Sequence, residues 1–195
     1  MTPTTDQFYI QKSLLGDTRA FGILVERYQD YIFTLVYRMV KSREEAEEIA
    51  QDTFLKAYEA LAQFRGEAKL STWLYRIAYR KSLDKLRQNK GNYSLELNEE
   101  ITGCDIEDIE NGLEYMLQAE KTEIIRKCIL QLPEQEAAII TLYYFEEQSV
   151  KEIREVTGLT EDNIKVKLYR SRKLLFSLLE NYIGSTIPKK NGKAI

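Results

Sequence analysis

Apolar residues recur along this chain at spacings of three and four, which is the period of an amphipathic α-helix. Two clear runs extend from Phe21 to Val36 and from Ile49 to Leu61. Strand-like alternation is missing, and the three prolines, at positions 3, 133 and 188, leave nearly the whole chain free to be helical. The pattern therefore predicts an all-α protein.

The helical pattern is interrupted by residues 91–120. This stretch has nine acidic residues, no basic residue and three glycines, a composition typical of a flexible linker with little core of its own. We therefore expect two small helical domains, at residues 1–90 and 121–183, joined by this acidic linker. Residues 184–195 are predicted to form a flexible tail.

The second domain contains a pattern typical of a helix-turn-helix. Ser149 and Glu152 have the spacing of a capping box, in which each side chain satisfies a backbone amide of the first helical turn. Gly158 fits the end of that helix, and Thr160 fits the cap of the next one. A short turn followed by a basic helix is the layout that enters a DNA major groove. The alternative is an ordinary helical hairpin with a solvated basic face.

The second of these helices has one apolar face and a largely basic remainder. Its predicted buried positions recur at spacings of four, three and four: Ile164, Leu168, Ser171 and Leu175. Between positions 163 and 173 there is no acidic residue, and the basic residues are Lys165, Lys167, Arg170, Arg172 and Lys173. Such a face predicts attraction to the phosphates of DNA.

The first domain has a second concentration of positive charge. Residues 64–90 hold eight basic residues and two acidic ones, and the helix predicted from Ser71 also carries three aromatic residues. Cations beside rings predict nucleic-acid binding in which unpaired bases stack on the rings. The loop at residues 64–70, FRGEAKL, is a candidate site for an extruded base. The alternative is that the rings belong to the core and the cations form a solvated face.

The amino-acid composition excludes several classes of catalytic and metal-binding site. The chain of 195 residues has 28 basic and 31 acidic residues and no histidine, which excludes histidine-dependent nucleophiles, histidine-ligated metals and imidazole proton shuttles. Two cysteines, Cys104 and Cys128, make neither a disulfide framework nor a zinc site. With no secretory pattern and no apolar run of about 18 residues, we expect a cytoplasmic protein without membrane insertion, metal or cofactor.

Together these segments resemble the extracytoplasmic-function (ECF) group of bacterial RNA polymerase sigma factors. The resemblance to sigma region 2 rests on GDTRAF, EEAEEIAQDTFLKAYEAL and FRGEAKLSTWLYRIAYRKSLDKLR. The resemblance to sigma region 4 rests on LPEQEAAIITLYYFEEQSVKEIREVTGLTEDNIKVKLYRSRKLL. These motifs cover about residues 14–90 and 121–179, in the order and at the spacing of the family.

The resemblance implies a dissociable subunit that gives core RNA polymerase its promoter specificity and has no catalytic site of its own. Its partners would be the clamp helices of the largest polymerase subunit, the flap of the second-largest subunit, promoter DNA as duplex and as melted single strand, and an anti-sigma factor. The linker would thread the cationic channel of the polymerase, where its carboxylates mimic nucleic acid.

The resemblance also implies three sets of binding residues. The set for the melting −10 element is Phe64, Arg65, Lys69, Trp73, Tyr75, Arg76, Tyr79, Arg80 and Arg87. The set for the −35 duplex is Asn163, Lys165, Val166, Lys167, Tyr169, Arg170 and Lys173. The set for core polymerase is Glu48, Gln51, Asp52 and Leu55. The chain departs from the family pattern at Arg80, where asparagine is common, and at Arg154, where alanine is usual. We expect Arg154 to point partly outward or to pair with an acidic residue.

Two other functions remain open at this point. A helix-turn-helix regulator that acts without joining the polymerase would explain residues 121–183, but not the aromatic and basic helix or the acidic helix at residues 43–61. A nuclease would need clustered carboxylates to hold a metal. Its candidates, from Glu44 to Asp52, lie on one helix without obvious converging partners.

Overall fold

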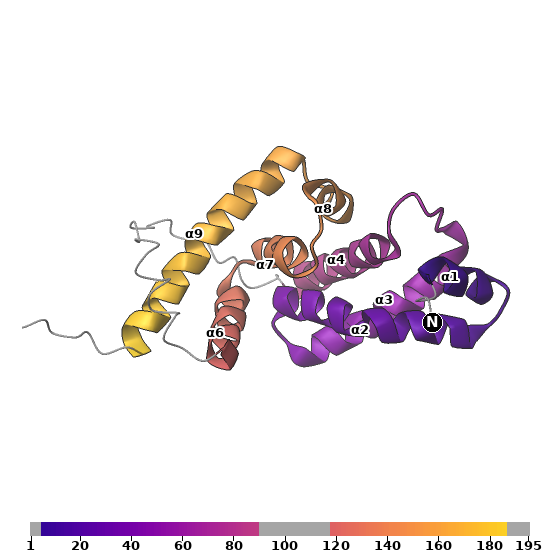
Figure 1. Ribbon diagram of the computed structural model, residues 1–195, viewed down its shortest axis with the longest axis horizontal. Helices are drawn as coiled ribbons and strands as arrows, with labels where there is room; N and C mark the ends of the chain where they lie inside the picture. Colours follow the sequence, from indigo (N-terminus) through magenta and orange to yellow (C-terminus); the bar gives the residue numbers. More distant parts are fainter. Residues whose placement is uncertain (1–4, 90–117, 187–195) are drawn as a thin grey trace, which may run out of the picture.

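The computed structural model describes residues 5–89 and 118–186, and within these ranges every regular element is helical (Figure 1). The prediction of an all-α protein is confirmed. The first set of helices consists of α1 (Asp6–Leu14), α2 (Thr18–Val40), α3 (Arg43–Glu59), the short 3₁₀ turn η1 (Leu61–Gln63) and α4 (Leu70–Asn89). The second set consists of α6 (Gln118–Gln131), α7 (Glu134–Ile140), the π-helical turn η2 (Thr141–Phe145), α8 (Val150–Thr157) and α9 (Glu161–Thr186). Most of the predicted linker, and residues 187–195 of the predicted tail, lie outside the described residues.

The first set forms a bundle in which α2 contacts α1, α3 and α4. Polar residues fix the starts of its long helices, because the Asp17 side chain accepts two backbone amides at the start of α2 and the Ser42 hydroxyl accepts one at the start of α3. Apolar residues at helical spacing fill the centre. They include Leu24, Ile32, Leu35, Phe54 and Leu74.

The second set contains the helix-turn-helix, with α6 lying beside the C-terminal part of α9 (Figure 1). The predicted capping box is present: the Ser149 hydroxyl accepts the Glu152 amide, and the Glu152 carboxylate accepts the Ser149 amide at 2.8 Å. Gly158 has a φ of 75°, the left-handed conformation that ends α8 and allows the turn into α9. The helix-turn-helix prediction is confirmed.

The two sets of helices touch and share one apolar core. We call the surface where they meet the interdomain contact: α8 packs against α4, and α7 packs against α2 (Figure 1). Leu74 on α4 and Ile153 on α8 belong to the same buried cluster. Polar side chains are buried here as well, and Arg38 is only 6% exposed. Contacts between distant helices leave no periodic signal, so the sequence suggested two domains on a linker without showing that they meet.

Candidate nucleic-acid and protein interfaces

The loop between η1 and α4 forms a small pocket, which we call the loop pocket. It has a volume of about 220 Å³. The rings of Phe64 and Trp73 lie side by side in its wall, with centroids 5.1 Å apart and planes at 45°. Arg65 and Arg76 also line it, as does Glu155, which comes from α8. Rings and cations predicted to bind an unpaired base are therefore brought together, with an acidic neighbour that was not predicted.

Helix α4 divides its predicted DNA-binding residues between surface and core. The arginines Arg76, Arg80 and Arg87 are exposed, and Trp73 is half-buried. The other two rings, Tyr75 and Tyr79, are each 2% exposed. For these two tyrosines the structure supports the alternative reading, in which the rings belong to the core. Their position follows from helical spacing, since they share a face of α4 with buried Thr72, Leu74 and Ala78.

Burial raises the pKa of both phenols, and a hydrogen bond adds to this effect at Tyr75. The Tyr75 hydroxyl donates to the Glu146 carboxylate, which follows η2. Burial, aided by this hydrogen bond, raises the pKa of Tyr75 well above its ordinary value. Burial also raises the pKa of Tyr79 to about 12. Burial likewise raises the pKa of Glu146, while the hydrogen bond from Tyr75 and the nearby charge of Arg38 oppose that shift.

Helix α9 presents the basic face that was predicted. The Thr160 hydroxyl caps the helix by accepting the Asn163 amide at 3.3 Å. Ile164, Leu168 and Ser171 are buried, as their spacing indicated. The predicted −35 residues that are exposed are Asn163, Lys165, Val166, Tyr169, Arg170 and Lys173.

Lys167 differs from the other predicted −35 residues, because it is half-buried and paired with the protein itself. Its Nζ lies 2.6 Å from Glu136 Oε1 on α7. Lys173 and Tyr169 both stay exposed, and the ammonium group of Lys173 lies 5.0 Å from the centre of the Tyr169 ring.

Arg154 lies 3.5 Å from the Glu161 carboxylate, so the expectation that it would pair with an acidic residue is confirmed.

The acidic face of α3 meets basic residues of α4. Asp52 Oδ2 lies 2.9 Å from Lys81 Nζ, and Glu48 Oε2 lies 3.2 Å from Lys85 Nζ. The sequence suggested that these acids were either plain surface or a docking face for a basic protein. The structure adds a third role, in which they neutralise two of the cations that make residues 64–90 basic. Surface pairs of this kind contribute up to about 1 kcal/mol each to stability.

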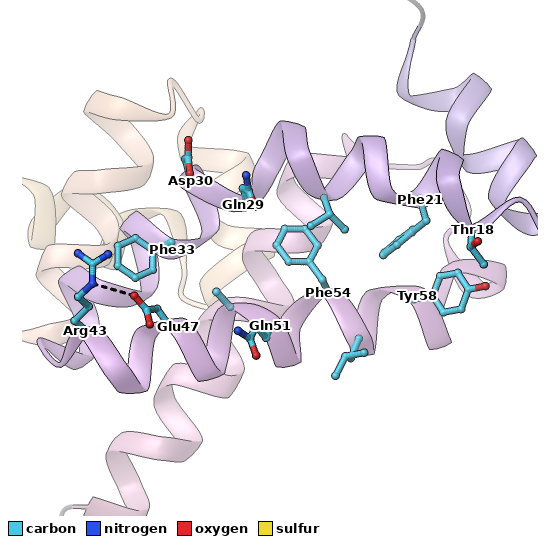
Figure 2. Close-up of a pocket in the computed structure, with 13 residues that line it drawn as sticks. Thr18, Phe21, Gln29, Asp30, Phe33, Arg43, Glu47, Gln51, Phe54 and Tyr58 are labelled. Atoms are coloured by element: carbon cyan, nitrogen blue, oxygen red, sulfur yellow. Dashed lines mark hydrogen bonds and ion pairs between the residues drawn. The ribbon is translucent and has the colours of Figure 1, made fainter.

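A larger groove lies between α2 and α3, and we call it the α2–α3 groove (Figure 2). Its volume is about 870 Å³. The rings of Phe21, Phe33 and Phe54 point into it (Figure 2). Gln51 and Leu55, two of the residues predicted to bind core polymerase, line the groove, and Leu55 is 64% exposed. The other two predicted residues face α4 instead.

A buried polar cluster at the interdomain contact was not predicted. Arg38 donates to Thr141 Oγ1 at 3.0 Å, and its guanidinium carbon lies 4.2 Å from the centre of the Phe145 ring. Burial lowers the pKa of Arg38 to about 10, so the side chain stays charged at neutral pH. Nearby, the Thr72 hydroxyl donates to Gln148 Oε1 at 3.0 Å. An arginine within the apolar run VYRMV is the one trace of this cluster in the sequence.

Comparison with known proteins assigns the two sets of helices. Residues 24–91 match Sigma-70 region 2, and residues 122–175 match Sigma-70, region 4. The ECF RNA polymerase sigma factor SigW of Bacillus subtilis is 34% identical over 168 residues, which cover 82% of this chain and 89% of that protein. The chain belongs to the ECF RNA polymerase sigma factors. This sigma factor is therefore a specificity subunit for transcription initiation and not itself a catalyst.

A further relative agrees with this assignment, and two solved structures have a similar fold. The RNA polymerase sigma-H factor of Pseudomonas aeruginosa is 33% identical, over 92% of this sigma factor and 96% of its own length. CnrH, solved in complex with the cytosolic domain of CnrY, has a similar fold, with a TM-score of 0.62 and 22% identity over 90% of this chain and 97% of CnrH. RpoE of Bartonella quintana, solved with the anti-sigma factor NepR, has a TM-score of 0.58 and 18% identity over 82% and 96% of the two chains.

Among the helices of residues 5–89 and 118–186, none combines the length and apolar character needed to cross a membrane. The same residues contain no group of three or more acidic or cysteine side chains arranged to hold a metal ion.

Proposed function

We propose that this sigma factor binds core RNA polymerase through the α2–α3 groove, the melted −10 element through the loop pocket and the arginines of α4, and the −35 duplex through α9. The observation that carries the proposal is the separation of these surfaces. The groove, the arginines and the basic face of α9 belong to different elements and are exposed to solvent. One chain in the cytoplasm would thus have room for the polymerase and for both promoter elements at once.

The groove suits a helical protein partner. Large exposed apolar side chains mark interaction surfaces, and here Leu55 and Tyr58 are exposed beside a floor of phenylalanine rings. The ion pair between Arg43 and Glu47, at 2.9 Å, supplies a polar rim at one end (Figure 2). The proposed occupant is the clamp helices of the largest polymerase subunit. Gln51 and Leu55 would touch them, while Glu48 and Asp52 would support α3 from the side of α4.

The loop pocket and α4 have the two components that single-strand binding requires. Stacking on an aromatic ring contributes about 1–3 kcal/mol per base, and Phe64 and Trp73 offer rings at the pocket wall. Arg76, Arg80 and Arg87 offer exposed cations for the phosphate backbone. Because Tyr75 and Tyr79 are buried, we propose that they support the fold of this surface and do not stack on bases.

The exposed face of α9 has the properties of a recognition helix. Lys165, Arg170 and Lys173 offer positive charge, and Val166 and Tyr169 offer exposed apolar area. The flap of the second-largest polymerase subunit is the proposed protein partner of this second set of helices. An anti-sigma factor is the proposed regulator, since RpoE of Bartonella quintana is described in complex with one.

Two exposed leucines offer a matched test of polymerase binding. Leu55 lies in the groove, whereas Leu15 is 87% exposed at the end of α1 and is not part of the groove lining. Leu55→Asp should weaken binding to core polymerase at least about tenfold in a competition titration, because it buries a carboxylate in an apolar interface. Leu15→Asp should bind like the wild type. Equal affinities for both variants would exclude the groove as the docking site.

Transcription in vitro tests the promoter-binding part. Core polymerase reconstituted with this protein, given fragmented genomic DNA, should start at new sites that share one pair of upstream motifs. On those templates Lys165→Ala should weaken binding to the −35 duplex. It should also lower the slope of log K against log salt concentration by about one, because one phosphate contact is lost. Salt-sensitive duplex binding without any new start would instead favour a regulator that acts without joining the polymerase.

A further inference from the structure

Arg154 is an exposed basic residue of the helix-turn-helix that lies outside the proposed set of −35 contacts. It belongs to the last turn of α8, where its backbone carbonyl accepts the Gly158 amide at 2.8 Å. Helix α8 lies beside the start of α9 (Figure 1), and the Arg154 guanidinium lies 3.5 Å from the carboxylate of Glu161, the first residue of α9. The pair therefore holds a positive charge at the junction of the two helices.

This junction is a suitable place for a phosphate contact. When a helix-turn-helix docks, the N-terminal residues of its second helix reach the base edges, while its first helix crosses the phosphate backbone. Arg154 comes from the first helix and extends to the first turn of the second. A guanidinium has several N–H donors in a planar fork, so it can contact Glu161 and still donate to a phosphate.

Lys167 lies on α9 itself but is held away from solvent. Its Nζ lies 2.6 Å from Glu136 Oε1 on α7, and the two side chains are only 27% and 20% exposed. A phosphate would have to displace a carboxylate that already satisfies this ammonium group in a half-buried place. The acidic partner of Lys165, in contrast, is the exposed Asp162, at 3.5 Å. Lys165 can therefore exchange its partner for DNA at little cost, and Lys167 cannot.

We propose, on the basis of the proposed function, that Arg154 contacts a phosphate at the edge of the −35 major groove and that Lys167 does not contact DNA. Arg154 supplies from α8 a positive charge that Lys167 does not supply from α9. Lys167 instead joins α9 to α7 through Glu136. Because a phosphate contact carries no direct sequence information, Arg154 adds affinity for the duplex, and the preference for particular bases comes from the exposed face of α9.

The salt dependence of duplex binding tests both halves of this proposal, because each neutralised phosphate adds about one to the slope of log K against log salt concentration. Two matched variants each remove one ion pair and leave the net charge unchanged: Arg154→Gln with Glu161→Gln, and Lys167→Gln with Glu136→Gln. Binding of the reconstituted holoenzyme to a fluorescein-labelled promoter duplex is measured by anisotropy. The first variant should lower the slope by about one, and the second should leave it unchanged.

The expected change in slope has a direct consequence for affinity. Relative to the wild type, the Arg154 and Glu161 variant should lose roughly three- to fourfold more affinity at about 50 mM salt than at about 200 mM. The loss should be similar on duplexes that carry single substitutions in the −35 motif, because a phosphate contact is insensitive to sequence. A loss confined to one base pair would overturn the phosphate contact in favour of base reading.

Two further variants separate the possible causes of failure. Lys165→Ala reports on α9 alone, and an unchanged slope in both this variant and the Arg154 and Glu161 variant would contradict the proposed function. If Lys165→Ala lowers the slope and the Arg154 and Glu161 variant does not, the Arg154 contact is wrong and the proposed function stands. A lower slope in the Lys167 and Glu136 variant would show that Lys167 contacts DNA after all. Arg154→Lys keeps the charge and should keep the wild-type slope, so an equal fall with lysine would overturn the phosphate contact by showing that these variants act through the fold.

Discussion

Replacing Arg38 by methionine keeps most of the side-chain volume at the interdomain contact and removes its charge. The wild-type guanidinium donates to Thr141 Oγ1 at 3.0 Å and lies 4.2 Å from the centre of the Phe145 ring. A hydrogen bond from a charged group contributes about 1.5–3 kcal/mol, and a cation–π contact about 0.5–2 kcal/mol. Part of the stability lost with these two contacts is regained, because methionine avoids the cost of burying a charged guanidinium. We expect the free energy of unfolding to fall by about 2 kcal/mol.

Urea unfolding, followed by fluorescence and by circular dichroism, measures this change. With an m-value of about 1–3 kcal/mol/M, the expected loss lowers the midpoint by roughly 1 M. Trp73, the one tryptophan of the chain, reports on the first set of helices, whereas the helical dichroism reports on both sets. Because the two sets share a core, both signals should give the same midpoint in the wild type. Separate midpoints would refute the shared core.

A double-mutant cycle with Glu146→Gln shows whether the charge of Arg38 acts at this contact. Each group shifts the pKa of the other toward its charged form, so each single change leaves the remaining group without that support, whereas the double variant removes both groups. We therefore expect the double variant to be more stable than the sum of the single changes predicts, by about 1 kcal/mol or more. Arg80→Met, at an exposed position of α4, is the control and should leave the midpoint unchanged. Additive effects, or an Arg38→Met midpoint equal to that of the wild type, would refute the reasoning.

Two further predictions concern pH and backbone conformation. Lys69 and Ser149 lower the pKa of Glu152 to about 2, so the stabilising contribution of Glu152 is complete above its unfolded pKa of about 4.3 and is lost as the pH falls from there toward 2. Glu152→Gln should therefore make the urea midpoint less dependent on pH over that range. An unchanged pH dependence would contradict this. Gly158→Ala should destabilise the protein by about 1–2 kcal/mol, because its φ of 75° disfavours a side chain even though nothing lies within 4 Å of the added carbon; Gly22→Ala, which has equal space inside helix α2, should instead be neutral or stabilising, and similar melting temperatures for the two variants would refute the difference.

The parts that sequence reasoning predicted well are those specified by local rules. The capping box at Ser149, the glycine stop at Gly158 and the cap at Thr160 each involve residues within a few positions of one another. The buried face of α9 follows from a period of 3.6 residues. Local chemistry of this kind is written directly into the order of residues, so the helix-turn-helix could be predicted without a structure.

The parts that sequence reasoning missed depend on partners far away in the chain. Helical spacing places Tyr75 on the same face of α4 as buried Ala78, but Glu146, which accepts its hydroxyl, lies 71 positions away in the chain. Lys167 looked like its neighbours until Glu136 was found beside it. Whether a polar residue faces solvent or another helix is decided by packing, and no spacing rule contains that information.

The distribution of acidic residues also explains how a chain with net charge −3 can be proposed to bind DNA. On α3, Glu48 and Asp52 pair with lysines of α4, so that part of the positive charge of residues 64–90 is compensated within the first set of helices. On α8, Glu152 compensates Lys69 through a contact between separate sets of helices. The first kind of pair lies within one set of helices, whereas the second kind joins the two sets. The salt dependence of single-strand binding should therefore be steeper for the Glu152→Gln variant than for the wild type, because one more lysine can then neutralise a phosphate and release its condensed counterion into solution.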